Sequence, residues 1–163
     1  MAEQLLDKFF PDECIVVPMP SSAKRMEGKE QHWGALELCK RAVAKGLAAD
    51  CEELLERTET VPKSHLQKSK DRVSAENHYK TMRATKGCLG VKRSFTIVDD
   101  VITRGATLIG AAARLREAFP QATVRGFAFA RTLIRRCVER LPDPLDGHVV
   151  IYPSGATFRF QEE

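Results

Sequence analysis

The chain of 163 residues has no apolar run that approaches the ~18 residues needed to span a membrane. Its N-terminal sequence, MAEQLLDKFF, contains acids and no small-residue cleavage site, which is unlike a secretory signal peptide. We therefore expect a cytoplasmic protein that makes no use of a membrane.

Paired cysteines are also missing. The chain has 5 cysteines, an odd number, and no C-x-x-C pair stands among them. This spacing argues against a disulfide framework or a zinc site and predicts reduced, mostly buried thiols. The cysteines are Cys14, Cys39, Cys51, Cys88 and Cys137.

The composition is that of an ordinary soluble domain. Hydrophobic residues make up 43% of the chain and charged residues 29%, and the length suits one domain with a substantial core. The net charge of +4 is mildly basic. Positive charge suits a nucleic acid or a polyanionic sugar phosphate, so charge alone does not choose between these partners.

The strongest chemical pattern lies in residues 95–107, FTIVDDVITRGAT. An apolar segment runs directly into two carboxylates, Asp99 and Asp100. A short apolar run that ends in polar residues predicts a buried parallel strand, and ligands of open α/β sheets bind beyond the carboxyl ends of such strands. Two carboxylates at that position suit neighbouring sugar hydroxyls or a divalent ion.

A loop and a predicted helix follow the acids. The loop offers two hydroxyls, the backbone N–H groups around a glycine and the positive end of a helix, a combination that binds phosphate. A strand end with an Asp-Asp turn before an ordinary helix is the alternative interpretation. The loop residues are Thr103, Arg104, Gly105, Ala106 and Thr107, and the helix is predicted from Leu108, Ala112, Leu115 and Phe119, with Pro120 closing it.

VDDVITRGAT resembles the phosphoribosyl pyrophosphate (PRPP) motif of the type I phosphoribosyltransferases. The resemblance implies an α/β fold with a mainly parallel central sheet flanked by helices. It implies that Asp99 and Asp100 hold the ribose hydroxyls and Mg²⁺, the ion directly or through water, and that residues 103–107 bind the 5′-phosphate. Arg104 departs from the family, where many members carry Thr, Ser or Ala, and it either adds a phosphate contact or points into solvent.

An earlier predicted strand, residues 14–17, ends in a basic turn. Pro18 and Pro20 prevent further ladder pairing, so the chain must turn there. In type I phosphoribosyltransferases the corresponding loop contacts pyrophosphate, whereas a solvated basic turn is the alternative. The candidate pyrophosphate-binding residues are Ser21, Ser22, Lys24 and Arg25.

Residues 57–86 are the most polar part of the chain. A solvated excursion with a short helix around residues 71–82 is the simplest interpretation. The resemblance instead implies the flexible catalytic loop of the family, which closes over pyrophosphate and excludes water. Lys68 and Arg72 would then be catalytic residues that neutralise the departing pyrophosphate.

A looser resemblance, to the ComF-like phosphoribosyltransferases without their zinc ribbon, covers residues 14–132. This range is the expected core, preceded by an arm at 1–13. The matching residues are Val17, Pro18, Pro20, Lys24, Arg25, Arg57, Thr60, Leu66, Ser69, Arg72 and Asn77.

Within the core we also expect a helix over residues 31–48, a short element near 51–55 and a strand over 123–130. Trp33 is expected to pack in the core rather than to bind a ligand.

Residues 133–163 predict an amphipathic helix and then a β-hairpin with its tip at residues 153–155. With the arm at 1–13 they are candidates for the hood that selects the acceptor in type I phosphoribosyltransferases. A dimer or partner surface is the alternative. Three aromatic residues of the hairpin are suited to stacking on a base, namely Tyr152, Phe158 and Phe160. Aromatic residues in a hairpin more often serve only to pack against their neighbours.

The expected function is a phosphoribosyltransferase that binds PRPP and Mg²⁺ and displaces pyrophosphate from the anomeric carbon. The alternative is a PRPP-sensing or DNA-associated ComF-like accessory protein with weak or no transferase activity. An unrelated doubly wound domain that uses the acids for Mg²⁺ alone leaves the threonine loop unexplained. A homodimer is compatible with the sequence, nucleic acid is not favoured as a partner, and no pattern identifies the acceptor.

Overall fold

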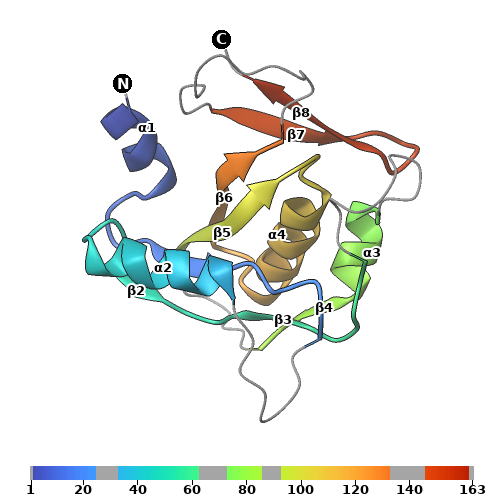
Figure 1. Cartoon of the computed structure of the whole chain (residues 1–163), viewed down its shortest axis with the longest axis horizontal. Coiled ribbons are helices and arrows are strands. Elements are labelled where there is room, and N and C mark those ends of the chain that lie inside the picture. The colour runs from blue at the N-terminus through green and yellow to red at the C-terminus, as the bar shows by residue number, and fades with distance from the viewer. Residues whose placement is uncertain (1, 25–32, 63–72, 86–92, 133–145, 162–163) are drawn as a thin grey trace.

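The computed structural model describes residues 2–24, 33–62, 73–85, 93–132 and 146–161. Within these ranges a 4-stranded parallel sheet forms the centre of the molecule, with the order β2-β1-β5-β6 (Figure 1). The predicted α/β class with a parallel sheet is thereby confirmed, as are the strands expected near 14–17 and 123–130. The strands are β1 (Ile15–Pro18), β2 (Asp50–Cys51), β5 (Ser94–Ile102) and β6 (Thr123–Arg131).

Two helices connect neighbouring strands of this sheet. α2 (Gly34–Ala44) joins β1 to β2, and α4 (Ala106–Ala118) joins β5 to β6, as the sequence predicted. The Trp33 indole donates to the Met19 carbonyl at 2.7 Å and packs against the core, which confirms its structural role. None of the helices in the described ranges is long and apolar enough to cross a membrane.

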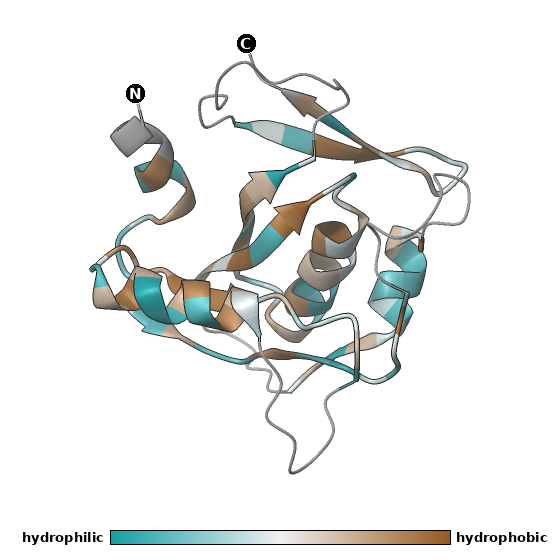
Figure 2. Ribbon diagram, viewed as in Figure 1, coloured by the Kyte–Doolittle hydropathy of each residue, from teal (hydrophilic) through white to brown (hydrophobic). Residues whose placement is uncertain are grey.

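The core consists of two apolar clusters. Because successive strand residues face opposite sides, Val17 and Ile97 pack with Leu115 of α4, whereas Val16 packs with Cys39 of α2. Figure 2 shows the corresponding brown segments on the central strands, α2 and α4. Burial on both faces explains why β1 and the first part of β5 are apolar almost without interruption.

Cys14 and Cys39 are buried and Cys51 is half-buried, all three as free thiols, in agreement with the sequence. Cys88 and Cys137 lie outside the described residues.

The short helix expected around residues 71–82 is present as α3 (Ala75–Lys80), and the described part of the polar stretch after residue 57 also forms a pair of strands. β3 (Leu55–Arg57) and β4 (Met82–Ala84) pair antiparallel, and α3 begins at Ser74, whose hydroxyl accepts the Asn77 N–H at 3.2 Å. Ala75, His78 and Met82 are spaced by three and four residues, and all three are buried. Residues 63–72, which include Lys68 and Arg72, lie outside the described part of the chain.

The two ends of the chain lie beside the sheet. α1 (Ala2–Phe9) is joined to the C-terminal region by an ion pair between Lys8 and Asp146, and Phe10 packs edge-on against Phe127 with 5.0 Å between ring centroids. The predicted hairpin is present as β7 (Gly147–Ile151) and β8 (Thr157–Gln161). It lies across the end of the sheet at which β5 and β6 finish (Figure 1). The helix predicted just after residue 132 falls outside the described residues.

We predict that Gly110→Ala lowers the free energy of unfolding by about 2–3 kcal/mol, because overpacking at a helix contact forces the neighbours apart. A Cβ at Gly110 would lie 2.8 Å from the backbone nitrogen of Tyr79 and 2.9 Å from the carbonyl oxygen of Ala75. Urea denaturation measures the change.

Gly34→Ala is the matched control, since the nearest atom to its added Cβ is the Asp100 Oδ2, at 3.8 Å. It should be neutral or slightly stabilising, because alanine favours helix. Equal effects of the two substitutions would contradict the proposed tight contact of α3 and α4.

Candidate functional site

The direction of strand addition reverses between β1 and β5. The chain passes from β1 outward to β2, then returns across β1 to β5 and continues to β6. Ligands of open α/β sheets bind beyond the carboxyl ends of the strands at such a reversal. β1 pairs with β5 as far as Pro18 opposite Val98, and the next N–H, of Met19, donates to the Val98 carbonyl at 2.8 Å. Asp99 is therefore the first residue of β5 beyond the end of β1.

The acids lie within β5, not after it as the sequence pattern suggested. β5 continues to Ile102 because β6 still pairs with it there, with Asp99 opposite Ala128 and Ile102 opposite Arg131. β6 therefore pairs with Asp99 and with Val101, the residues on either side of Asp100. On the opposite side of β5 the two acids have no pairing with β1, because that strand ends at Pro18.

The Asp99 carboxyl lies in an unusual environment. Burial, with the neighbouring Asp100 carboxyl as the second cause, raises the pKa of Asp99 to about 7, while the Arg57 guanidinium acts in the opposite direction. Asp99 also accepts the backbone N–H of Asp100 at 3.0 Å. Near neutral pH the Asp99 carboxyl is therefore close to its midpoint of ionisation and can both donate and accept hydrogen bonds, which suits a hydroxyl-bearing ligand.

Asp100 is exposed and borders the start of α2. Its Oδ1 accepts the backbone N–H of Val101 at 2.7 Å, and its Oδ2 is the atom nearest to a Cβ placed on Gly34. The first turn of α2 thus lies on the same side of the site as Asp100, while the charge of Arg57 in β3 acts on Asp99.

The loop of residues 103–107 leads into α4 as predicted. Gly105 is the N-cap of the helix with φ of 84°, a left-handed conformation that suits glycine. A Cβ there would also lie 2.6 Å from the Cγ2 of Val149 in β7, so the hairpin contacts the loop at this residue. The first N–H groups of a helix have no partners within it, and with the helix dipole they attract anions. The start of α4 therefore has the general features of a helix terminus that attracts anions.

Arg104 neither extends freely into solvent nor lacks neighbours. It is half-buried, and its guanidinium carbon lies 6.0 Å from the centre of the Phe158 ring in β8. A cation over an aromatic ring is mildly favourable. Arg104 therefore joins the loop to the hairpin, a second contact beside that of Gly105.

The basic turn after β1 is held by the segment that follows β3. The Ser22 carbonyl accepts the Val61 N–H at 2.8 Å, and the Lys24 N–H donates to the Thr60 hydroxyl at 3.1 Å. The Ser21 hydroxyl accepts the N–H of residue 23 at 3.1 Å. Because β1 and β5 are adjacent, this turn lies at the same edge as the acids, and Lys24 is exposed there. Arg25 lies outside the described residues.

Sequence reasoning missed two buried residues below the site. Arg57 of β3 is 6% exposed, and His78 of α3 is 2% exposed. The Arg57 Nη2 lies 3.0 Å from the Nδ1 of His78, and the Nε2 of His78 lies 3.3 Å from the hydroxyl oxygen of Thr107. Arg57 was recognised only as a ComF-like match. The spacing of His78 between Ala75 and Met82 is the signal that could have placed it in the core.

The residues present suit Mg²⁺ better than a metal held by protein alone. No group of three or more His, Cys, Asp or Glu side chains in the described part of the chain is arranged around a metal position. Mg²⁺ is usually bound by one or two carboxylates together with water and substrate phosphates. Asp99 and Asp100 supply that number of carboxylates.

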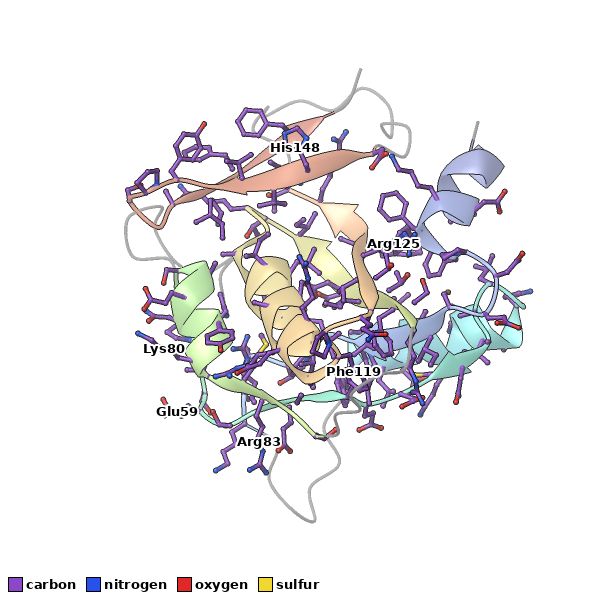
Figure 3. All side chains as sticks on the ribbon, turned by 180° about the vertical axis from the view of Figure 1, so that it is seen from behind. Glu59, Lys80, Arg83, Phe119, Arg125 and His148 are labelled. Atoms are coloured by element: carbon purple, nitrogen blue, oxygen red, sulfur yellow. The ribbon has the colours of Figure 1, made fainter. Side chains whose placement is uncertain are left out.

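The hairpin presents different residues to its two sides. Thr157 is buried, Val149 contacts Gly105, and the Arg159 Nη2 donates to the Thr132 carbonyl at 2.9 Å. The aromatic side chains are 42–49% exposed and pair among themselves. Tyr152 packs edge-on against Phe158 and His148 stacks on Phe160, each with 5.4 Å between ring centroids; Figure 3 shows His148 on the outer side of β7.

Comparison of the chain with models of protein families, with curated proteins and with solved structures finds no match. Assignment of a function therefore depends on the residues and the geometry described above.

We predict that Asp99→Asn stabilises the protein at pH 8 by about 2–4 kcal/mol and has little effect at pH 4. A carboxyl whose pKa is raised from 3.8 to about 7 by folding opposes folding once it ionises. The protonated Asp99 carboxyl therefore does not oppose folding below pH 4. As the pH rises from 4 through 7 the free energy of unfolding falls, until the carboxyl is ionised in the folded protein as well. Thermal or urea denaturation across this pH range measures the difference.

Asp12→Asn is the control, because Asp12 is exposed on a turn away from the site. It should show no comparable dependence on pH. A stability difference for Asp99→Asn that stays constant from pH 4 to pH 8 would contradict the burial of this carboxyl.

Proposed function

We propose that the protein is a phosphoribosyltransferase of type I fold, which binds PRPP with Mg²⁺ and transfers the phosphoribosyl group to an acceptor. One observation carries the proposal: the acid pair, a glycine-started helix and a basic turn meet at the edge where the strand order reverses. The three features match the three parts of PRPP, namely the ribose diol, the 5′-phosphate and the pyrophosphate.

In the proposed complex the ribose lies over the end of β5. Asp99 and Asp100 accept hydrogen bonds from its two hydroxyls, since ionised carboxylates are strong acceptors. Pairing of Asp99 and Val101 with β6 fixes the backbone around the two acids, which suits the orientation of a rigid ring. The elevated pKa of Asp99 implies that ligand binding draws a proton from it at neutral pH.

The 5′-phosphate is proposed to bind at the start of α4. In the proposed complex the N–H groups of the first turn after Gly105 and the hydroxyls of Thr103 and Thr107 would bind the anion. Thr103 and Thr107 are half-buried, so these hydroxyls lie at the boundary of the core rather than on an exposed surface. The contact of Gly105 with Val149 holds the loop from the side of the hairpin.

The pyrophosphate is proposed to bind along the turn after β1. Ser21, Ser22 and Lys24 belong to this turn, and the hydrogen bonds from residues 60 and 61 support it. The assignments of Arg25, Lys68 and Arg72 to the pyrophosphate rest on the sequence resemblance. Mg²⁺ held by Asp99 and Asp100, directly or through water, would supply positive charge toward the pyrophosphate oxygens.

The proposed reaction breaks the bond between the anomeric carbon and the pyrophosphate oxygen while the acceptor forms a bond to that carbon. Positive charge develops on the sugar ring, and the nearby carboxylates stabilise it. Neither acid forms a covalent bond. The N-terminal arm and the hairpin are proposed as the hood beside the acceptor, because Gly105 and Arg104 already join the hairpin to the phosphate loop.

A PRPP-sensing or DNA-associated accessory protein is the second candidate. Its support, the basic stretch 57–86, is weakened by the fold, because Arg57 is buried, Lys80 pairs with Glu76 and Arg83 pairs with Glu56. A mobility shift with single- and double-stranded DNA over a salt series tests this candidate, since phosphate contacts give a steep salt dependence. Salt-sensitive DNA binding without pyrophosphate release from PRPP would favour it over the transferase.

We predict that wild-type protein binds PRPP in the presence of Mg²⁺ and that Asp99→Asn with Asp100→Asn weakens this binding about a hundredfold. Loss of two charge-assisted hydrogen bonds costs about 3 kcal/mol or more, which corresponds to that factor. Isothermal titration calorimetry measures the affinity.

Asp7→Asn with Asp12→Asn is the matched control, because it removes the same formal charge at two exposed positions outside the site. Its affinity should equal that of the wild type. Equal affinities for all three proteins, or no binding to any of them, would overturn the proposed donor site. If the wild type binds PRPP, a pyrophosphate-release screen over candidate bases and amines identifies the acceptor.

A further inference from the structure

Two buried side chains, Arg57 and His78, link two half-buried residues of the proposed donor site. The link begins at Asp99, whose carboxyl interacts electrostatically with the Arg57 guanidinium. It continues through the 3.0 Å contact from Arg57 to His78 and ends with the 3.3 Å contact from His78 to Thr107. The carboxylate assigned to the ribose and the hydroxyl assigned to the phosphate are thus connected through two residues that have no place in the binding of PRPP described above.

The chemistry of these groups fixes the direction of each hydrogen bond. A guanidinium can only donate, so the Nδ1 of His78 must accept and carries no proton. A neutral imidazole then carries its proton on Nε2, which donates to the Thr107 hydroxyl oxygen. Burial, with the positive Arg57 as the second cause, lowers the pKa of His78 to about 4, in agreement with a neutral ring.

The packing of α3 against α4 holds this contact at a fixed length. Gly110 lies three residues after Thr107, on the same side of α4, and a Cβ there would be 2.8 Å from the Cβ of His78. Arg57 is also held by its Nη1, which donates to the Thr81 hydroxyl at 2.8 Å. Its buried Nε has no hydrogen-bond partner among the described residues.

We propose that Arg57 and His78 are positioning residues of the donor site, which orient the Thr107 hydroxyl to donate its proton to the phosphate. The proposal rests on the proposed function. Because Thr107 receives the Nε2 proton of His78 on its oxygen, its own proton points away from His78. Without His78 the hydroxyl would have no fixed direction, and a bound phosphate would meet a lone pair as often as a proton.

The first test does not require PRPP. Proton–nitrogen correlation spectra of ¹⁵N-histidine-labelled protein report the protonation of each ring nitrogen, and His78→Gln identifies the His78 signals among the 4 histidines. We expect a neutral ring with its proton on Nε2 at pH 7. Arg57→Gln should remove the preference for this tautomer, whereas Arg83→Gln should preserve it. A proton on Nδ1 in the wild type, or no effect of Arg57→Gln, would overturn the proposal whatever the protein binds.

Arg83 is a suitable control because it pairs with Glu56 across the same two strands but is exposed; Figure 3 shows it on the outer side of this strand pair. Should Arg57→Gln fail to fold, Thr107→Val replaces it, since it leaves Arg57 and His78 intact and removes only the acceptor. The Nε2 proton of His78 should then exchange faster with water. Unchanged exchange would contradict the link to Thr107.

The second test measures coupling in PRPP binding with Mg²⁺. Arg57→Gln and Thr107→Val are each expected to weaken the affinity by about tenfold, and the double variant by much less than the product of the two effects. If the wild type binds PRPP and the losses of affinity in the two single variants multiply in the double variant, the positioning role is overturned but the proposed function is not. No PRPP binding by the wild type would overturn both the proposed function and this role in binding, and the histidine spectra would still decide whether the link exists.

Discussion

The site depends on the early end of β1. Pro18 is the last residue of this strand and Pro20 follows after one residue, so the ladder to β5 ends at Val98. β5 continues to Ile102 with β6 as its only strand partner in the described part of the chain, which leaves Asp99 and Asp100 beside the turn that leads away from β1. The same arrangement places the start of α4 next to the end of β5, because the chain must reverse direction in the loop of residues 103–107 at that edge.

A second constraint is the burial of charge next to the acids. Asp99 lies in an environment that disfavours its ionised form, and Arg57 is buried with one N–H unpartnered among the described residues. Such groups reduce stability unless they interact with each other. Their mutual attraction offsets part of this cost, and a ligand with hydroxyls and a metal ion would offset more. Without a ligand, the site therefore contributes less to the stability of the folded protein than an apolar core would.

The sequence predicted the elements whose patterns are local. The apolar run of β5, the spacing of Leu108 and Leu115 in α4 and the turn at 153–155 each identify their own structure, and the structure confirms them. Residues 57–86 were harder, because the burial of Arg57 and His78 results from the packing of α3 on α4 and not from a run of apolar residues. The proposed ribose and 5′-phosphate sites consist of consecutive residues and could be proposed from the sequence alone; Arg57 and His78 come from separate elements, and their contact could not.

A crystal structure of the protein with PRPP and Mg²⁺ tests the central claim most directly. We predict that the ribose hydroxyls lie within hydrogen-bond distance of Asp99 and Asp100, with the 5′-phosphate on the backbone N–H groups after Gly105 and the pyrophosphate along the turn of Ser21 and Ser22. PRPP bound at another surface, or crystals that remain free of it at saturating concentration, would contradict the account.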